Sequence, residues 1–438
     1  MLASNLLLLL SSFTPLVRAA SNPQSRPPLL PRVVEPSKTC TVNPLGNGRD
    51  DVPQILAAFR DCNNGGTVVF PEGETYSIAT RLNPVIHDVT IDWRGTWLLS
   101  DDLAYWRANS YPIAFQNHHG GFVISGERIR IDGHGTGGIN GNGNAWYNAE
   151  KANTQPGRPM PFLFWNVSDV TVEHFSVKDS PLWALNIMNG TRLRFRDITC
   201  NSTALRAPYG TNWVQNTDGF NTMDASDVEL TDFYYQGGDD CVAIKPRSYN
   251  IFIRNVTCHG GNGIAIGSLG QYLEDSSVEN LTIKDVHVQT YNDDMHNSAY
   301  IKTWIGELAP QGSNYESAGQ PRGGGWGSVS NLRFENFYIQ GAAGGPTIDQ
   351  NSGNNGSFAG TSNMEVSNIT FKNFTGWINT RSGRTASLSC SKRKPCYNIA
   401  FEDISLAASE NGVPAGARGS CTNVKPGGVT GLTGSGCS

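Results

Sequence analysis

The sequence reads Val-Thr-Val-Glu-His-Phe-Ser-Val at residues 170–177, and the same alternation of apolar and polar residues returns 23 residues later at 193–200. Six further copies follow, at 228–235, 251–258, 281–288, 332–339, 369–374 and 399–406. Each copy predicts two short strands of period two, joined by a turn at a central polar pair that is often Asn or Asp. One copy cannot bury its apolar side, but stacked copies enclose a continuous interior column.

A repeat near 23 residues, with short strands and no helices between them, favours an all-β, single-domain, right-handed parallel β-helix. A β-sandwich with regular hairpins is the alternative, and the scarcity of Asn-Gly turn signals between the strands counts against it. The ends of a solenoid need capping. Residues 51–61 follow helical spacing, with Asp50 or Asp51 at the N-cap position, and we expect a helix there to close the N-terminal end. Its apolar positions are Val52, Ile55, Leu56 and Phe59.

The N-terminus indicates export. Residues 1–19 are expected to be a signal peptide, because the apolar run Leu6–Leu10 is too short to span a bilayer and Val17–Ala19 offers a small-residue cleavage site. Residues 20–38 are Pro-rich and predict a disordered leader. The remaining residues, 39–438, are assigned to one β-helix domain, and the protein is predicted to be secreted and extracellular.

Cysteine spacing agrees with an oxidising compartment. Of the nine cysteines, eight can close short local loops, as Cys40–Cys62, Cys241–Cys258, Cys390–Cys396 and Cys421–Cys437. Cys200 is left over and is predicted to be buried as a small apolar residue. Eight Asn-x-Ser/Thr sequences offer glycosylation sites and favour a glycoprotein; they are Asn166, Asn189, Asn201, Asn255, Asn280, Asn355, Asn368 and Asn373.

Composition narrows the classes of partner. The net charge of −5 gives no reason to expect nucleic acid binding, and no apolar run is long enough to cross a membrane. No CxxC pair or His/Cys cluster indicates zinc, and no metal or cofactor is predicted. A capped solenoid needs no second copy of itself, and a monomer is expected.

Four polar motifs fall on successive turns of the predicted coil. They are Asn216-Thr-Asp-Gly-Phe220, Gly237-Gly-Asp-Asp-Cys241, Cys258-His-Gly-Gly-Asn-Gly263 and Tyr300-Ile-Lys-Thr-Trp304. Asp218 and Asp239 are 21 residues apart, and Asp240 and His259 are 19 apart, which is about one coil in each case. Because neighbouring coils lie roughly 4.8 Å apart, these side chains are expected to stack on one face of one sheet.

Clustered carboxylates suit the cleavage of a glycosidic bond. One carboxylic acid protonates the leaving oxygen, and a carboxylate activates water or attacks carbon. Mutual repulsion raises the pKa of one member and keeps it protonated. His259 can hold the proton network, and Lys302 can pair with a carboxylate on the substrate. A role as a turn former is the alternative for any single Asp, but the shared register of the motifs favours a catalytic site.

Together the four motifs resemble those of the polygalacturonases, glycoside hydrolase family 28, and the resemblance covers essentially the whole chain after Thr39. It implies a right-handed parallel β-helix that hydrolyses α-1,4-linked galacturonic acid with inversion, without a metal or cofactor. Stacking of adjacent coils by itself suggests instead the shorter carboxylate separation of retaining enzymes.

The resemblance also implies roles for single residues. Asp239 would be the general acid, and Asp218 and Asp240 would hold and activate the attacking water. His259 would support protonation of the acid, and Lys302 would bind the substrate carboxylate. Two neighbours within the motifs, Asn216 and Tyr300, are taken as further substrate contacts.

The chain departs from the family pattern at one place, since Tyr300 stands where the family usually has the arginine of Arg-Ile-Lys. The loss of one substrate-binding cation favours relatives that cut from the chain end. Inserts at 99–112, 291–299 and 306–327 agree, because loops that wall off one end of a groove turn it into a pocket. Three basic residues are candidates for additional carboxylate contacts, with ordinary surface cations as the alternative: Lys245, Arg247 and Arg322.

The first hypothesis is a pectin-degrading exo-galacturonidase that releases galacturonic acid from the non-reducing end of homogalacturonan. A hydrolase that releases galacturonic acid from rhamnogalacturonan is the runner-up, because both substrates present galacturonate at the cleavage point. Three further alternatives are an endo-polygalacturonase, a pectate lyase that holds calcium with its carboxylates, and a non-catalytic polysaccharide-binding solenoid.

Overall fold

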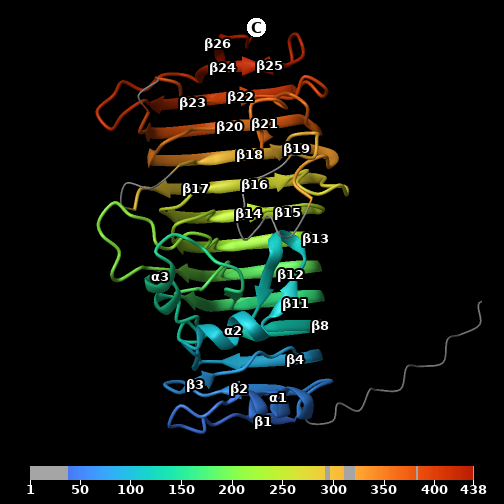
Figure 1. The fold of residues 1–438 in the computed structure, drawn as a ribbon, viewed down its shortest axis with the longest axis vertical. Helices are drawn as coiled ribbons and strands as arrows, with labels where there is room; N and C mark the ends of the chain where they lie inside the picture. The colour runs from blue at the N-terminus through green and yellow to red at the C-terminus, as the bar shows by residue number, and fades with distance from the viewer. Residues whose placement is uncertain (1–37, 292–295, 310–320, 381–382, 438) are drawn as a thin grey trace, which may run out of the picture. The chain divides into compact units, whose positions relative to one another are not determined.

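The computed structural model describes residues 38–291, 296–309, 321–380 and 383–437. Within them the chain winds as a right-handed parallel β-helix (Figure 1), as the repeat predicts. The expected signal peptide and all of the expected leader except Lys38 lie outside the described residues. No helix in the described part combines the length and apolar character needed to cross a membrane.

The strands of the β-helix stack in parallel, each on the strand one coil earlier. In chain order they are β1 (Thr39–Thr41), β2 (Thr67–Phe70), β3 (Thr75–Ile78), β4 (Val85–Trp93), β5 (Thr96–Leu99), β8 (Val123–Asp132), β9 (Gly138–Asn140), β11 (Phe162–Lys178), β12 (Leu185–Asn201), β13 (Phe220–Gln236), β14 (Val242–Ile244), β15 (Ser248–His259), β16 (Ile264–Leu269), β17 (Val278–Gln289), β18 (Ala299–Trp304), β19 (Trp326–Ala342), β20 (Thr347–Ser352), β21 (Asn363–Ile378), β22 (Ser387–Ser389), β23 (Tyr397–Ala407), β24 (Arg418–Thr422), β25 (Val429–Thr430) and β26 (Thr433–Ser435). A small second sheet is formed by β6 (Tyr111–Ile113), β7 (His118–Gly120) and β10 (Pro159–Met160).

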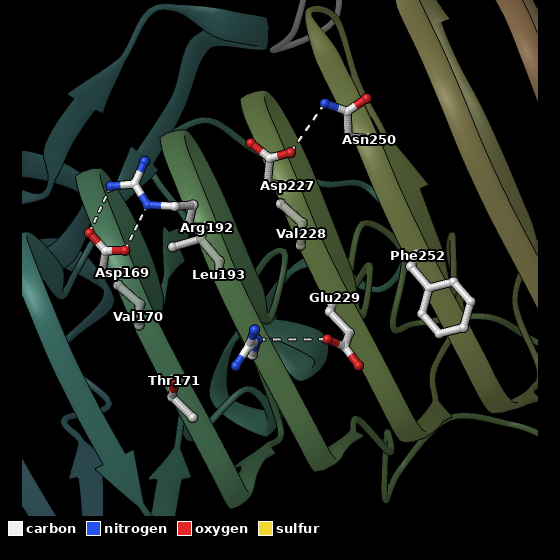
Figure 2. Close-up of a pocket in the computed structure, with 11 residues that line it drawn as sticks. Asp169, Val170, Thr171, Arg192, Leu193, Asp227, Val228, Glu229, Asn250 and Phe252 are labelled. Atoms are coloured by element: carbon white, nitrogen blue, oxygen red, sulfur yellow. Dashed lines mark hydrogen bonds and ion pairs between the residues drawn. The ribbon is translucent and has the colours of Figure 1, made fainter.

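The long strands bend at single residues in the left-handed conformation. In β12 these corners are Asn189, Arg192 and Asp197, with φ of 59°, 59° and 52°. Asn and Asp tolerate this region better than most L residues, which explains why they stand at the centre of each repeat. Corner side chains also bond to one another along the stack, as where Asn250 Nδ2 donates to Asp227 Oδ1 at 3.1 Å (Figure 2). We call these stacked corner residues the corner ladder.

Alternate residues of each strand fill the interior column. Phe162 pairs in register with Leu185, Leu185 with Phe220, and Phe220 with Val242, and all four side chains are fully buried. Toward the C-terminus the phenylalanines of neighbouring coils stack, with Phe337 and Phe374 at 4.5 Å between ring centroids. The interior is therefore a continuous apolar column, and its alternation directs the other residues of each strand outward.

The helix α1 (Val52–Asp61) caps the N-terminal end and begins after Asp51, as predicted. It buries Val52, Ile55, Ala58 and Phe59 against the first coils. The Asp51 carboxylate does not cap a backbone N–H of α1, but accepts Nε2 of Gln54 and the backbone N–H groups of Leu45 and Ser77, each at 2.7 Å. Three further short elements lie outside the repeats, so the periodicity of the sequence does not predict them. They are the helices α2 (Leu103–Asn109) and α3 (Asn144–Glu150) and the 3₁₀ turn η1 (Phe115–Asn117).

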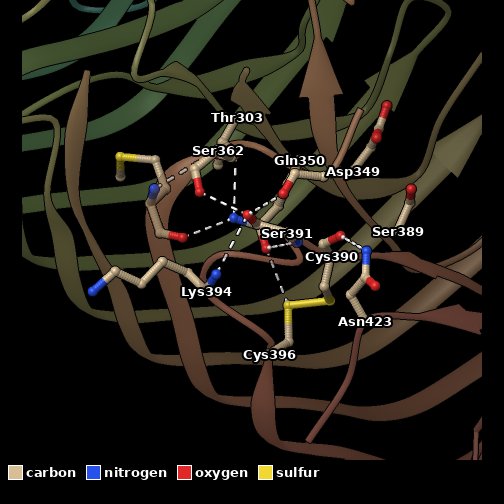
Figure 3. Close-up of a disulfide and its surroundings, with 12 residues drawn as sticks. Thr303, Asp349, Gln350, Ser362, Ser389, Cys390, Ser391, Lys394, Cys396 and Asn423 are labelled. Carbon is tan, nitrogen blue, oxygen red and sulfur yellow. Dashed lines mark hydrogen bonds between the residues drawn. A yellow bond between two sulfur atoms is a disulfide. The ribbon is translucent and has the colours of Figure 1, made fainter. Parts of the chain in front are cut away.

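The structure forms all four disulfides that the cysteine spacing predicts. Cys200 is buried and unpaired, again as expected. Figure 3 shows Cys390–Cys396 beside the fully buried Gln350, whose Nε2 donates to the Met364 carbonyl at 2.9 Å and whose Oε1 accepts Ser391 N–H at 3.0 Å. The disulfide and this buried amide thus hold the C-terminal coils together.

Candidate active site

Three carboxylates come together at the turns that lead into β13 and β14. Because Phe220 pairs with Val242, Asp218 and Asp240 take equivalent positions on neighbouring coils. Both are 2 % exposed, and Asp239 precedes Asp240 directly. The sequence spacing predicts Asp218 one coil from Asp239 and Asp240 one coil from His259, but in the structure Asp218 is equivalent to Asp240 and His259 pairs with Gln236. The motifs that contain Asp218 and Asp240 still meet at one edge of the sheet.

Each of two carboxylates has an ammonium partner, one of them buried and the other partly exposed. Lys245 Nζ lies 3.4 Å from Asp218 Oδ2, and both side chains are nearly inaccessible, at 4 % and 3 % exposure. Lys302 Nζ lies 3.1 Å from Asp240 Oδ2, and the Tyr300 hydroxyl donates to Asp240 Oδ1. Lys302 also donates to the Tyr300 oxygen at 3.0 Å. Tyr300 thus positions Asp240 and Lys302 where the family pattern has an arginine.

Asp239 accepts hydrogen bonds only from neutral groups in the described part of the chain. Its Oδ2 accepts the backbone and side-chain N–H groups of Asn216, at 3.0 and 3.3 Å. Its Oδ1 accepts the N–H of Asp240 at 2.8 Å and Nδ2 of Asn262 at 3.1 Å. These donors fix the direction of the carboxyl group without supplying a positive charge.

The pKa values follow from this pattern. Burial and the charge of Asp240 raise the pKa of Asp239 to about 6. Burial alone would also raise the pKa of Asp240, but the ammonium groups of Lys302 and Lys245 hold it below its ordinary value. The pKa of Asp218 is raised by burial and by Asp239, against the opposing effect of Lys245. Three carboxylates, of which Asp218 and Asp240 are buried and Asp239 is partly buried, thus face two ammonium groups, and a single shared proton leaves the cluster neutral.

His259 lies at the edge of this cluster. Its Nδ1 lies 3.1 Å from Gln236 Oε1 and 3.4 Å from the Tyr234 hydroxyl, and its ring packs against Tyr291. Partial burial lowers the pKa of His259. Its described hydrogen-bond partners do not include a carboxylate of the cluster, so its support of the acid stays a prediction.

The other candidate cations have separate surroundings. Arg247 binds the carboxylate of Asp224 and donates to the Asp275 carbonyl at 2.7 Å. A role for Arg247 in substrate binding stays a prediction. Arg322 is 6 % exposed and lies over the Trp304 ring at 4.6 Å, so it is not an ordinary surface cation.

Sequence reasoning did not assign roles to two residues of the site. Asn262 reaches Asp239 from one coil away, and its separation of 23 residues is the signal that could have identified it. Trp183 lies under the Lys245 ammonium, 4.0 Å from the ring centroid, where a cation–π contact holds the lysine over Asp218. Trp183 stands in an irregular turn, where no periodicity points to it.

A hollow of about 450 Å³ elsewhere on the molecule is not part of this site. It lies on the outer face of β11, β12, β13 and β15, and Figure 2 shows that its charged groups have partners, with Asp169 bonded to Arg192 and Asp227 to the amide of Asn250. Arg192, for example, donates to both oxygens of Asp169 at 2.7 Å. None of the three clustered carboxylates lines this hollow.

Gly261 offers a test of how tightly Asp239, the predicted acid, is positioned. It has φ of +73°, and a Cβ there would lie 1.9 Å from the Asp239 carbonyl oxygen. We expect Gly261→Ala to displace Asp239 and to lower kcat/KM roughly tenfold, because small displacements of a catalytic group are costly. Gly135→Ala is the matched control, since Gly135 has φ of +78° but open space around the added methyl group. Equal activity of the two variants would contradict the expectation.

Comparison with known proteins identifies the relatives of this chain. The family model described as "Glycosyl hydrolases family 28" matches residues 64–434. A protein of Aspergillus niger named "Putative galacturan 1,4-alpha-galacturonidase C" is 63 % identical over 395 residues, which cover 90 % of this chain and 93 % of that protein. A protein of the same name from Neosartorya fischeri is 59 % identical over 406 residues, 91 % of this chain and 94 % of its own. Among solved structures, the endo-xylogalacturonan hydrolase of Aspergillus tubingensis has the same fold, with a TM-score of 0.73 and 23 % identity over 91 % of this chain and 100 % of that one.

Proposed function

Because this chain belongs to glycosyl hydrolases family 28, we propose that it is a secreted exo-hydrolase that releases galacturonic acid from the non-reducing end of homogalacturonan. The observation that carries the proposal is the buried cluster of three carboxylates and two ammonium groups. The names of the fungal relatives support the same terminal cleavage.

In the proposed reaction Asp239 protonates the leaving glycosidic oxygen. It suits this role because its pKa is raised to about 6 and no described ammonium group hydrogen-bonds to it. Burial raises the pKa of Asp218 most, and the charge of Asp239 raises it further; protonation of Asp239 removes the second cause, which leaves Lys245 to favour an ionised Asp218. Asp218 and Asp240 would then activate water on the opposite face of the sugar, which inverts the anomeric centre.

Exposure separates the roles of the two lysines. The Lys302 side chain is 25 % exposed and can offer an N–H group to a substrate carboxylate while it holds Asp240. The Lys245 side chain is 4 % exposed, which fits a counter-ion of Asp218 better than the substrate contact expected from sequence.

Terminal cleavage is also supported by a loop that crosses the stack. The segment with η1 leaves the coil of β5, and Gln116 Nε2 donates to Gln271 Oε1 at 2.8 Å, just after β16. The Gln116 N–H donates to the Tyr272 hydroxyl at 2.6 Å. A segment that is held at Gln116 against Gln271 and Tyr272 fits a wall that closes one end of a groove and leaves a pocket for one end of a chain. The inserts after Tyr291 and Gly306 fall partly outside the described residues, at 292–295 and 310–320.

Product analysis tests the proposal. The secreted protein is incubated with polygalacturonate and with rhamnogalacturonan oligomers, and early products are separated by chromatography. We expect galacturonic acid alone, with little loss of viscosity, and nuclear magnetic resonance should detect its β-anomer first, since hydrolysis of an α-linkage with inversion releases β. Mixed oligomers would indicate an endo enzyme, and unsaturated products a lyase. Better turnover of rhamnogalacturonan would favour the runner-up.

The pH dependence of activity follows from the pKa of Asp239. The acid works only while protonated, so we expect kcat/KM to fall as the pH rises through about 6. Measurement of initial rates between pH 3 and 8 checks this. A profile that still rises at neutral pH would contradict the assignment of Asp239 as the acid.

We further propose an extracellular monomeric glycoprotein. The four disulfides and the similarity to fungal galacturonidases support export. Four of the eight candidate glycosylation asparagines already donate Nδ2 within the corner ladder: Asn189, Asn255, Asn280 and Asn373. Asn355 is exposed outside the named strands, and mass spectrometry of tryptic glycopeptides would locate the sites used.

A further inference from the structure

A second hollow adjoins the active site. It has a volume of about 330 Å³ and is formed by the connection between β12 and β13 together with Tyr291, which follows β17. The same connection carries Asp218 at its end. The residues that line the hollow are Ala204, Ala207, Pro208, Tyr209, Gly210, Thr211, Trp213, Val214 and Tyr291.

Two contacts join this hollow to the catalytic turns. Asn212 Nδ2 donates to the Gly238 carbonyl at 2.7 Å, beside Asp239. Tyr291 packs edge-on against His259, with 4.8 Å between the ring centroids. The hollow therefore borders the turns that carry Asp239 and His259.

The lining has the chemistry of an uncharged sugar site. It contains three aromatic rings, which pack against the C–H faces of a sugar, and the described lining residues include no charged side chain. A galacturonate carboxylate would need a cation there. One ammonium group, that of Lys151, lies 5.7 Å from the Trp213 ring centroid but does not line the hollow.

Tyr209 adds a second observation. It is 85 % exposed at the tip of the connection, although its ring carries a large apolar surface. Packing of the protein itself does not account for this ring, whereas a sugar lying in the hollow would cover it.

We propose that the hollow formed by the β12–β13 connection and Tyr291 is a subsite for an uncharged sugar residue of the substrate. The inference rests on the proposed hydrolase function, because galacturonate remains at the cleavage point. Three sources share this chemistry: a neutral sugar within the chain, a pentose branch, and a galacturonate neutralised as its methyl ester.

The test compares oligosaccharides of equal length that all end in galacturonic acid. The first contains galacturonate alone, and in the second galacturonate alternates with rhamnose. The third is a galacturonate chain with a xylose branch, and the fourth is a galacturonate chain whose carboxylates are methyl-esterified. We expect Tyr209→Ala to lower kcat/KM roughly two- to tenfold on at least one substrate with an uncharged residue, and to leave the all-galacturonate substrate unchanged. The substrate with the largest loss identifies the source, and Tyr209→Phe should retain activity on it.

Tyr338→Ala is the matched control, because Tyr338 is 41 % exposed and packs edge-on against His287 as Tyr291 does against His259. An equal loss on all four substrates, or no loss on any, would overturn the subsite. Calorimetric Kd values measured with Asp239→Asn need no turnover. If adding Tyr209→Ala leaves every Kd unchanged, the subsite proposal has failed. If the unmodified enzyme releases galacturonic acid from no substrate, the hydrolase proposal has failed instead.

Discussion

Replacement of Asp239 by Asn is expected to lower kcat by roughly 10²–10⁴-fold, because an amide cannot donate the proton that the leaving oxygen needs. The change is nearly isosteric, and the Asn side-chain oxygen can still accept some of the N–H groups that surround Asp239. Folding and substrate binding should therefore persist. Initial rates on polygalacturonate and the thermal midpoint of unfolding, measured on the same preparation, check both expectations.

A matched carboxylate provides the control for this result. Asp169 lies in the corner ladder, is paired with Arg192 and is not part of the carboxylate cluster. Asp169→Asn should leave kcat unchanged. If Asp239→Asn retained most of the activity, another group would have to be the acid, and the pH profile of that variant would reveal its pKa.

Replacement of Lys245 by Met is expected to lower the free energy of unfolding by about 3–5 kcal/mol near neutral pH, because it leaves Asp218 as a buried charge without its partner. Lys245 lowers the pKa of Asp218, so its removal raises that pKa further. If the ionised form of Asp218 is the base, as proposed, the acid limb of the activity profile should move to higher pH. Denaturant unfolding and rates as a function of pH measure the two effects.

A double replacement distinguishes the effect of losing the Lys245–Asp218 ion pair from the effect of losing the lysine side chain itself. In Lys245→Met with Asp218→Asn neither position of the pair carries a charge, so most of the lost stability should return while activity stays low. Lys178→Met is the control, since Lys178 is exposed on the outer surface of β11. A stable and fully active Lys245→Met would contradict the role of Lys245 as the counter-ion of Asp218.

The parallel β-helix could be predicted because its determinants are local and repeated. Corner residues such as Asn255 and Asp285 must adopt φ near 56° and 59°, and the alternating residues around them must face inward or outward. Coil spacing brings the motifs of Asp218 and Asp240 together to within one residue of the predicted register and, at a separation of 23 residues, places Asn262 beside Asp239. Contacts between residues that are separated by about one coil can thus be predicted from the sequence.

The irregular connections are different, because no period fixes where their side chains go. Trp183 reaches Lys245 from such a turn, and Gln116 reaches Gln271 across several coils. The partner of Lys245 was also missed, since its distance from Asp218 depends on how a long side chain folds back within a buried space. The positions of side chains on the repeating coils could be predicted from the sequence. The positions of side chains on the irregular connections could not.

The corner ladder makes the molecule tolerant of some length changes and intolerant of others. A coil can lose or gain residues in an irregular connection, such as 202–219, while β12 and β13 keep their register. Deletion of one residue between two corners would instead turn every following side chain of that segment from interior to exterior. Insertions at the connections can therefore remodel the substrate groove during evolution. Deletion of a single residue within a coil cannot be tolerated in the same way, because it would exchange the interior and exterior side chains.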